Sequence, residues 1–204
     1  MQRGESVLAV ERPRIEPKAP LARHGLKVVD VSLNDINGGS FRVWVMHRRS
    51  SGDFAGPEAP DRVRDCLKRE FEQALDTTRP YEEFRARIEH VRAEMRTLVG
   101  RLRADGKVIY GYGASTKGNV ILQFCGLDHR DIVAIADRNP AKWGTRTLGS
   151  DIPIVSEAEA RQAKPDYMLM LPWHFLPEFL DRETEFIRRG GRFIVPLPNV
   201  RIVP

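Results

Sequence analysis

Two alternating segments near the start of the chain indicate strands. Residues 26–33 and 40–47 are rich in β-branched side chains and partly alternate between apolar and polar positions, with Asn37-Gly38-Gly39 between them. An Asn-Gly pair between two such runs predicts a β-hairpin, because these residues accept the positive φ of a tight turn. A lone hairpin is only marginally stable in water, so we expect it to pack against another element.

A linker and two helices follow the predicted hairpin. Residues 50–60 are rich in Gly, Ser and Pro, which is typical of a linker, and the pattern beyond them predicts helices over roughly 61–76 and 80–104. The apolar positions of the second helix recur at alternating spacings of three and four: Tyr81, Phe84, Ile88, Val91, Met95, Leu98 and Leu102. This is the seam of a coiled coil. It predicts either a long helix packed on its own domain or a homodimer through the 81–102 helix.

Short apolar strands and helices alternate from residue 106 onward. Strands are predicted at 107–112, 132–137, 167–171 and 192–197. Between them, Ser156 and Glu159 form a capping box, and Pro177 suits the first turn of a helix that runs to about residue 189. The predicted fold class is therefore α/β, with a Rossmann-like, doubly wound, mostly parallel sheet preceded by two helices and the N-terminal hairpin.

Length and composition narrow the class of protein. The 204 residues suit one domain and part of a second, with residues 1–20 as an irregular tail. Two cysteines, Cys66 and Cys125, supply neither a disulfide framework nor a four-ligand metal site, which fits a cytoplasmic protein without a bound metal. No run approaches the ~20 apolar residues that a membrane helix needs, so we expect no membrane partner.

The net charge of +5 does not indicate a nucleic-acid partner. The first fifty residues carry nine basic against five acidic side chains, so most of the excess lies there. No basic stripe lies beside aromatic residues, as nucleic-acid binding would require.

The strongest chemical signal is a glycine-rich turn. Residues 111–119 read GYGASTKGN and lie where a predicted strand passes into a helix. Small residues there let the backbone approach a ligand, and the free N–H groups of a helix start favour an anion such as a diphosphate. The spacing is neither the dinucleotide fingerprint nor a P-loop. The alternative is that the glycines only permit close packing of strand and helix.

Further candidates follow other strands at the same edge of the predicted sheet. Asp137 ends a strand, where an acidic residue often meets a ribose, and a loop with Asn139, Lys142 and Trp143 comes next. Trp173 could stack on a ligand or cover the core. The predicted substrate-binding residues are Gly111, Gly113, Ala114, Ser115, Lys117, Gly118, Asn119, Asp137, Asn139, Lys142, Trp173 and His174. No residue is assigned a catalytic or metal-ligating role.

Several motifs in order resemble one family. GYGASTKGNVILQFCGL, ADRNPAKWG, IPIV, LMLPWHF and GGRFIVPLP are similar to the C-terminal domain of S-adenosylmethionine-dependent C-methyltransferases that act on nucleotide-linked deoxysugars. The resemblance covers residues 61–204. Residues 21–49 resemble the terminal hairpin of the family's central methyltransferase domain, and 50–60 form the linker. The family pattern often has His at position 37 and Asn at position 174, where this chain has Asn37 and His174.

The resemblance implies a role in orienting substrate. The parent enzymes use S-adenosylmethionine to methylate a ketosugar carbon, and this domain helps to hold the nucleotide-linked sugar. The chain shows no donor-binding glycine motif upstream of the hairpin, so we expect it to lack its own S-adenosylmethionine site and to be inactive alone, unless a companion methyltransferase domain joins it. Two alternatives stay open: a stand-alone nucleotide- or NAD-binding module, and an inactive scaffold fragment.

Overall fold

The computed structural model describes residues 18–36, 39–52 and 55–204, and side chains from residue 21 onward within these ranges. Residues 1–17 of the tail predicted over residues 1–20, and the turn residues Asn37-Gly38, lie outside this description. Residues 18–20 are helical, so this end of the predicted irregular tail is wrong. The chain forms two compact units, residues 1–86 and 87–204. Each is described separately.

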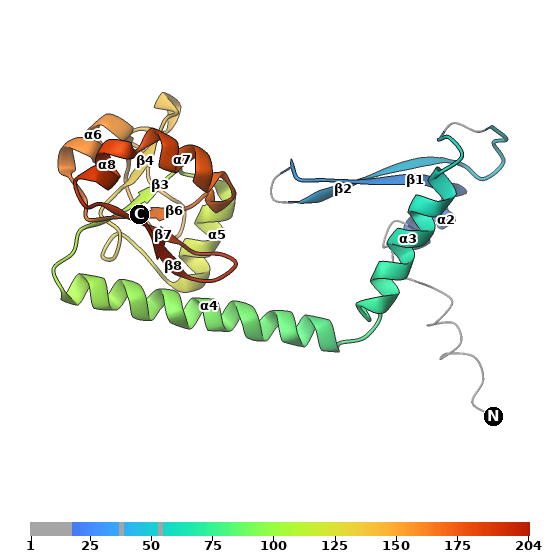
Figure 1. The fold of residues 1–204 in the computed structure, drawn as a ribbon, viewed down its shortest axis with the longest axis horizontal. Helices are drawn as coiled ribbons and strands as arrows, with labels where there is room; N and C mark the ends of the chain where they lie inside the picture. The colour runs from blue at the N-terminus through green and yellow to red at the C-terminus, as the bar shows by residue number, and fades with distance from the viewer. Residues whose placement is uncertain (1–17, 37–38, 53–54) are drawn as a thin grey trace. The chain divides into compact units, whose positions relative to one another are not determined.

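The first unit contains the predicted hairpin and two helices. Strands β1 (Leu26–Asn34) and β2 (Ser40–His47) pair antiparallel, with an irregularity in register between Val28 and Asp30. Helices α2 (Lys18–Arg23) and α3 (Ala59–Glu72) contact β1 (Figure 1).

An ion pair fastens α3 to the hairpin. Nε and Nη2 of Arg62 each donate to a carboxylate oxygen of Asp30 at 2.8 Å. These hydrogen bonds hold the pKa of Asp30 below its usual value. The hairpin therefore has a helix of its own to pack on, as its marginal stability in isolation requires.

Helix α4 (Arg79–Ala104) is continuous, and the division between the two units falls inside it. In the second unit Met95 and Leu102 are buried in the core, and Leu98 packs against it. This half of the apolar seam thus packs on its own domain, the first of the two alternatives above. Tyr81 and Phe84, in the N-terminal half of α4, are more than half exposed. A homodimer through α4 stays a prediction, and it would have to use this exposed half of the seam.

The second unit contains a six-stranded sheet in the order β5-β4-β3-β6-β7-β8, parallel except for the last strand. The strands are β3 (Ile109–Tyr112), β4 (Ile135–Asp137), β5 (Ile154–Ser156), β6 (Tyr167–Met170), β7 (Arg192–Val195) and β8 (Arg201–Val203). The helices are α5 (Thr116–Cys125), α6 (Glu157–Ala163), α7 (Leu176–Arg182) and α8 (Thr184–Arg188), with short 3-10 turns η2 (Pro140–Lys142) and η3 (Trp173–Phe175).

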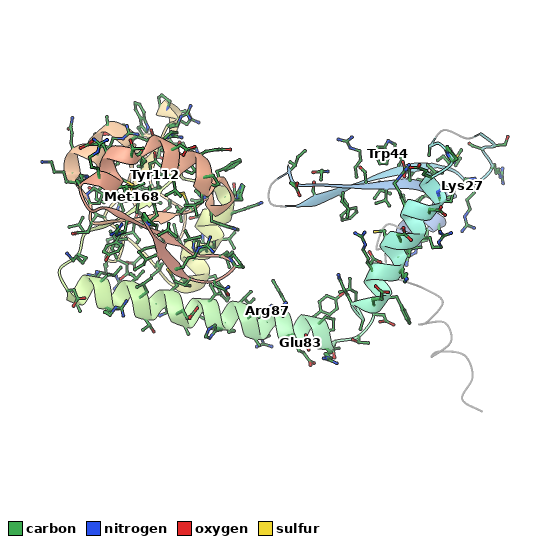
Figure 2. All side chains as sticks on the ribbon, in the orientation of Figure 1. Lys27, Trp44, Glu83, Arg87, Tyr112 and Met168 are labelled. Atoms are coloured by element: carbon green, nitrogen blue, oxygen red, sulfur yellow. The ribbon has the colours of Figure 1, made fainter. Side chains whose placement is uncertain are left out.

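Each face of this sheet has its own core. Alternate residues point to opposite faces, so Ile109 joins α4 and α5 on one side while Tyr110 and Tyr112 join α6, α7 and α8 on the other. Figure 1 shows these two layers of helices, and Figure 2 labels Tyr112 and Met168 in the sheet between them. The mixed α/β, Rossmann-like architecture confirms the predicted fold class.

Several features depart from the predicted elements. Helix α2 and strands β5 and β8 were not expected, whereas β4, which is also three residues long, lies within the longer apolar run predicted at 132–137. The single helix predicted to run to about residue 189 is two helices, which meet at Glu183. The side chain of Glu183 is buried and hydrogen-bonded, an environment that helical periodicity does not report. No helix in the described ranges is long and apolar enough to span a membrane.

Candidate functional site

The candidate site lies where the order of strands reverses. From β3 the chain runs outward through β4 to β5, then returns to place β6 on the other side of β3. In open α/β sheets, ligands bind at the carboxyl ends of the strands at such a switch point. The loops after β3 and β6 meet here: a Cβ added to Gly113 would lie 2.7 Å from Cγ of Pro172. The predicted glycine turn and the Pro172–His174 segment are therefore neighbours.

Packing explains the glycines of the turn. A side chain at Gly111 would meet Cγ1 of Ile135 at 2.7 Å, and one at Gly118 would collide with Cβ of Leu171. Gly113 has φ of +81°, which L residues with side chains rarely adopt. These contacts account for all three glycines without a ligand, as the packing alternative expected. They also bring the backbone of the turn to the edge of the sheet.

The start of α5 offers backbone donors beside the turn. Ser115 is the N-cap, and its Oγ accepts from the backbone N of Gly118 at 3.0 Å. Thr116 and Lys117 occupy the first turn, where backbone N–H groups have no acceptor within the helix. The positive end of the helix dipole and the Lys117 ammonium both favour an anion at this position.

Asp137 joins the glycine turn to the loop after β4. Its Oδ2 accepts from the backbone N of Ala114 at 2.8 Å and from Nζ of Lys142 at 3.1 Å, and its Oδ1 accepts from the backbone N of Asn139 at 2.8 Å. Nζ of Lys142 also donates to the carbonyl of Ala114 at 2.7 Å. The structure thus unites four predicted site residues in one internal brace. A contact from Asp137 to a ribose stays a prediction. It would have to share a carboxylate that already accepts from three donors.

Trp173 and His174 follow β6 at the same edge. Trp173 is partly buried against the core on the α6–α8 face, so its position suits a residue that covers the core. Nδ1 of His174 is buried and has no hydrogen-bond partner among the described residues. Burial lowers the pKa of His174, and the charge of Lys117 lowers it further, while Glu178 opposes the shift. The neutral form of the imidazole is therefore favoured close to the glycine turn.

Asn119 contributes a second buried polar atom without a partner. It lies in the first turns of α5, and its Oδ1 has no hydrogen bond to any described residue. Buried polar atoms are nearly always paired, so each exception needs an explanation such as a missing water or ligand. Asn119 and His174 were both predicted as binding residues, and each retains hydrogen-bonding capacity.

A tryptophan that was not among the predicted binding residues also reaches this edge. Nε1 of Trp143 donates to the backbone carbonyl of Asp137 at 2.7 Å, yet the side chain stays 43% exposed. Its position in the loop after Asp137 was visible in the sequence. Its anchorage was not, because the hydrogen bond depends on the path of η2.

A buried polar network lies on the α6–α8 face of the same strand end. The Tyr112 hydroxyl donates to Oε1 of Glu183 at 2.5 Å, and Nη2 of Arg161 also donates to that oxygen at 2.5 Å. Glu157 and Arg182 complete the cluster. Burial alone would raise the pKa of Glu183, but the hydrogen bonds from Arg161 and Tyr112 lower it. Burial and the adjacent carboxylates raise the pKa of Tyr112, so it remains a hydroxyl.

The described residues offer no metal site and no activated thiol. They contain no group of three or more His, Cys, Asp or Glu side chains that could hold a metal ion. Burial raises the pKa of both Cys66 and Cys125. A raised pKa disfavours the thiolate, the nucleophilic form of cysteine.

Comparison with known proteins identifies the family. Fold and site define a Rossmann-like α/β unit with a glycine turn at its switch point. The C-methyltransferase C-terminal domain family matches residues 35–198, and the chain belongs to this family. It is 44% identical over 185 residues to the C-methyltransferase NovU of Streptomyces niveus, a match that covers 88% of this chain and 42% of NovU. The chain thus spans less than half the length of that relative.

The family match and the compact units are each defined by residues of their own. The match covers residues 35–198, which begin before β2. The two compact units divide at residues 86 and 87 instead. The predicted limits at 20, 49 and 60 stay a prediction.

Proposed function

We propose that this chain is the part of an S-adenosylmethionine-dependent C-methyltransferase that binds and orients a nucleotide-linked sugar, with the diphosphate at the glycine turn. One observation carries this proposal: backbone donors at the start of α5, the braced turn and the imidazole of His174, whose neutral form is favoured, converge at the switch point of a chain in this family. Oxygen-rich anions are the ligands that such helix starts favour.

The charges around the turn support a bound diphosphate. Lys117 lies on the first turn of α5, and Lys142 sits against the carbonyl of Ala114. The charge of Lys142 is already paired with Asp137, so the Lys117 ammonium and the positive end of the α5 dipole are the groups that favour a diphosphate diester. Asn119 and His174 add further hydrogen-bonding groups beside the proposed diphosphate position.

The turn does not fit S-adenosylmethionine as resident cofactor. A site for its ribose would need an acidic side chain that the two hydroxyl groups can reach, whereas Asp137 is only 8% exposed and its carboxylate already receives three donors. S-adenosylmethionine supplies the methyl group in the family's reaction, and we place its site outside the described residues. The same geometry disfavours the NAD-binding alternative.

Calorimetry on the full chain tests the proposal. We expect saturable binding of dTDP-glucose and no binding of S-adenosylmethionine or NAD. Lys117→Ala should weaken dTDP-glucose binding. Lys107→Ala is the matched control, because Lys107 precedes β3 at the opposite edge of the sheet, where it pairs with Asp166. Tight binding of S-adenosylmethionine would contradict the missing donor site, and binding of NAD alone would favour the dinucleotide alternative.

We also propose that a companion methyltransferase domain completes the enzyme. The chain matches 42% of NovU, and the hairpin exposes large apolar side chains: Leu33, Phe41, Trp44 and Val45. Mixing the chain with the portion of NovU that the match does not cover should give a complex in size-exclusion chromatography. Phe41→Lys should weaken that complex, whereas Arg42→Lys on the same strand should not.

A further inference from the structure

The anchorage of Trp143 fixes an exposed indole beside the glycine turn. Nε1 of Trp143 donates to the carbonyl of Asp137, whose Oδ2 accepts from Ala114. The backbone N of Trp143 donates to the carbonyl of Pro140 at 3.1 Å, and that of Gly144 donates to the carbonyl of Ile154 at 2.9 Å. The residue is therefore held at its ring and on both sides of its backbone. Groups fixed before binding lose little conformational entropy when a ligand arrives.

The chemistry that Trp143 can offer a ligand is limited to its ring faces. Its polar N–H is already used within the protein, and indole has no acceptor. The 43% exposed side chain thus presents chiefly apolar π surface. A planar aromatic group is the natural complement of that surface, because base–aromatic stacking is favourable for every nucleobase.

The other two tryptophans are less suited to this role. Trp173 is partly buried against the core on the α6–α8 face. Trp44 belongs to the first compact unit, on β2, where the guanidinium of Arg42 lies 5.6 Å from its ring. Within the second unit, Trp143 is thus the tryptophan with a large exposed area, although Trp173 was the one predicted for stacking.

We infer that Trp143 is the stacking platform for the base of the nucleotide whose diphosphate lies at the glycine turn, an inference that rests on the proposed function. Lys142 is adjacent in sequence, and its ammonium group contacts the glycine turn. The same short loop therefore joins the turn to the surface on which the base would stack. Stacking does not read hydrogen-bonding edges. The platform therefore contributes affinity for thymine, uracil and adenine nucleotides alike.

Fluorescence titration tests this inference. In a Trp44→Phe/Trp173→Phe background, Trp143 is the sole tryptophan of the chain. We expect dTDP to quench its emission to saturation, while inorganic pyrophosphate, which has no base, binds with little quenching. Calorimetry, which needs no tryptophan, measures both ligands in the variants: Trp143→Ala should weaken dTDP binding by roughly 5- to 150-fold and leave pyrophosphate binding unchanged. Trp143→Phe keeps an aromatic face without the N–H, so it should retain most of the affinity.

The outcomes separate this inference from the proposed function. Wild-type affinity for dTDP in Trp143→Ala would overturn the platform and leave a diphosphate site at the glycine turn. An equal loss of dTDP and pyrophosphate binding would also overturn it, because Trp143 would then only support the loop. Failure of the parent chain to bind either ligand would overturn the proposed function and the inference with it. Circular dichroism confirms that each variant is folded.

Discussion

The carboxylate of Asp137 accepts a hydrogen bond from the backbone N of Ala114 at 2.8 Å, across the ends of two neighbouring strands. This contact fixes the path of the glycine turn relative to the loop after β4. Asp137 therefore has a structural role, whereas its place at the end of a strand predicted a contact with ribose.

Removal of this brace should both destabilise the fold and loosen the site. We expect Asp137→Ala to lower the free energy of unfolding by about 2–4 kcal/mol, because a buried backbone N–H and an ammonium lose a charged acceptor. Urea denaturation measures the change, and calorimetry should show weaker dTDP-glucose binding. Asp151→Asn is the matched control, since it removes an exposed ion pair with Arg146 far from the turn. Equal stability of the two variants would contradict the bracing role.

Gly118 tests close packing of α5 on the sheet. We expect Gly118→Ala to destabilise the protein by about 1–3 kcal/mol, because the new Cβ would collide with Leu171. Gly100→Ala offers a control in α4, where a Cβ meets no atom within 4 Å. That substitution should stabilise the helix by up to about 1 kcal/mol. Thermal unfolding distinguishes the two, and a neutral Gly118→Ala would show that the helix can shift outward.

Tyr112 should link stability to pH through Glu183. The pKa of Glu183 is lower in the folded chain, so its contribution is fully present above its unfolded value of about 4.3 and is lost as pH falls through the folded value. We expect Tyr112→Phe to cost about 1–3 kcal/mol at neutral pH, and less below about pH 4. Urea denaturation at several pH values measures this difference.

Tyr110→Phe is the control for that series. Tyr110 lies on the same strand and the same core face, and its hydroxyl makes no hydrogen bond to a described residue. We expect little change in stability at either pH. A Tyr112→Phe effect that stayed constant from pH 7 to pH 3 would contradict the coupling with Glu183.

His174 should make binding of a diphosphate diester depend on pH. Its pKa is lowered in the free chain by burial and by Lys117, against the effect of Glu178. A bound anion nearby raises that pKa, so protonation accompanies binding and affinity for dTDP-glucose should rise several-fold from pH 8 to pH 6. The phosphates of this probe are diesters and do not titrate in that range. Calorimetry of His174→Asn should show no such rise, and a flat profile for the wild type would place the anion elsewhere.

Sequence patterns predicted most of the α/β unit because its longer helices show a period and strands β3, β4, β6 and β7 lie within longer apolar runs. The capping box at Ser156 and Glu159 was confirmed in detail, since both of its hydrogen bonds are local. The three-residue strands β5 and β8 carry too little pattern, and β8 pairs antiparallel with β7 through contacts that no local signal encodes. The seam of α4 was visible, but spacing alone cannot say which surface covers it.

The site was predictable in location and less so in detail. Strand order places the loops after β3, β4 and β6 at one edge, so the predicted site residues were expected to gather there. The roles of individual side chains depend on three-dimensional contacts. Tyr112 meets Glu183 across 71 positions of sequence, and the ring of Trp143 finds a carbonyl six positions back only through the geometry of η2.

Edge strands of very different length have a practical consequence for handling the protein. Both edges of the six-stranded sheet are three-residue strands, too short to template pairing with another molecule. The hairpin strands have nine and eight residues, and among the described residues each has a neighbouring strand on one side only. Long unpaired edges beside exposed apolar side chains promote aggregation. Precipitation during concentration should therefore begin at residues 26–47, and a charge introduced at Val45 should raise solubility more than one introduced on β8.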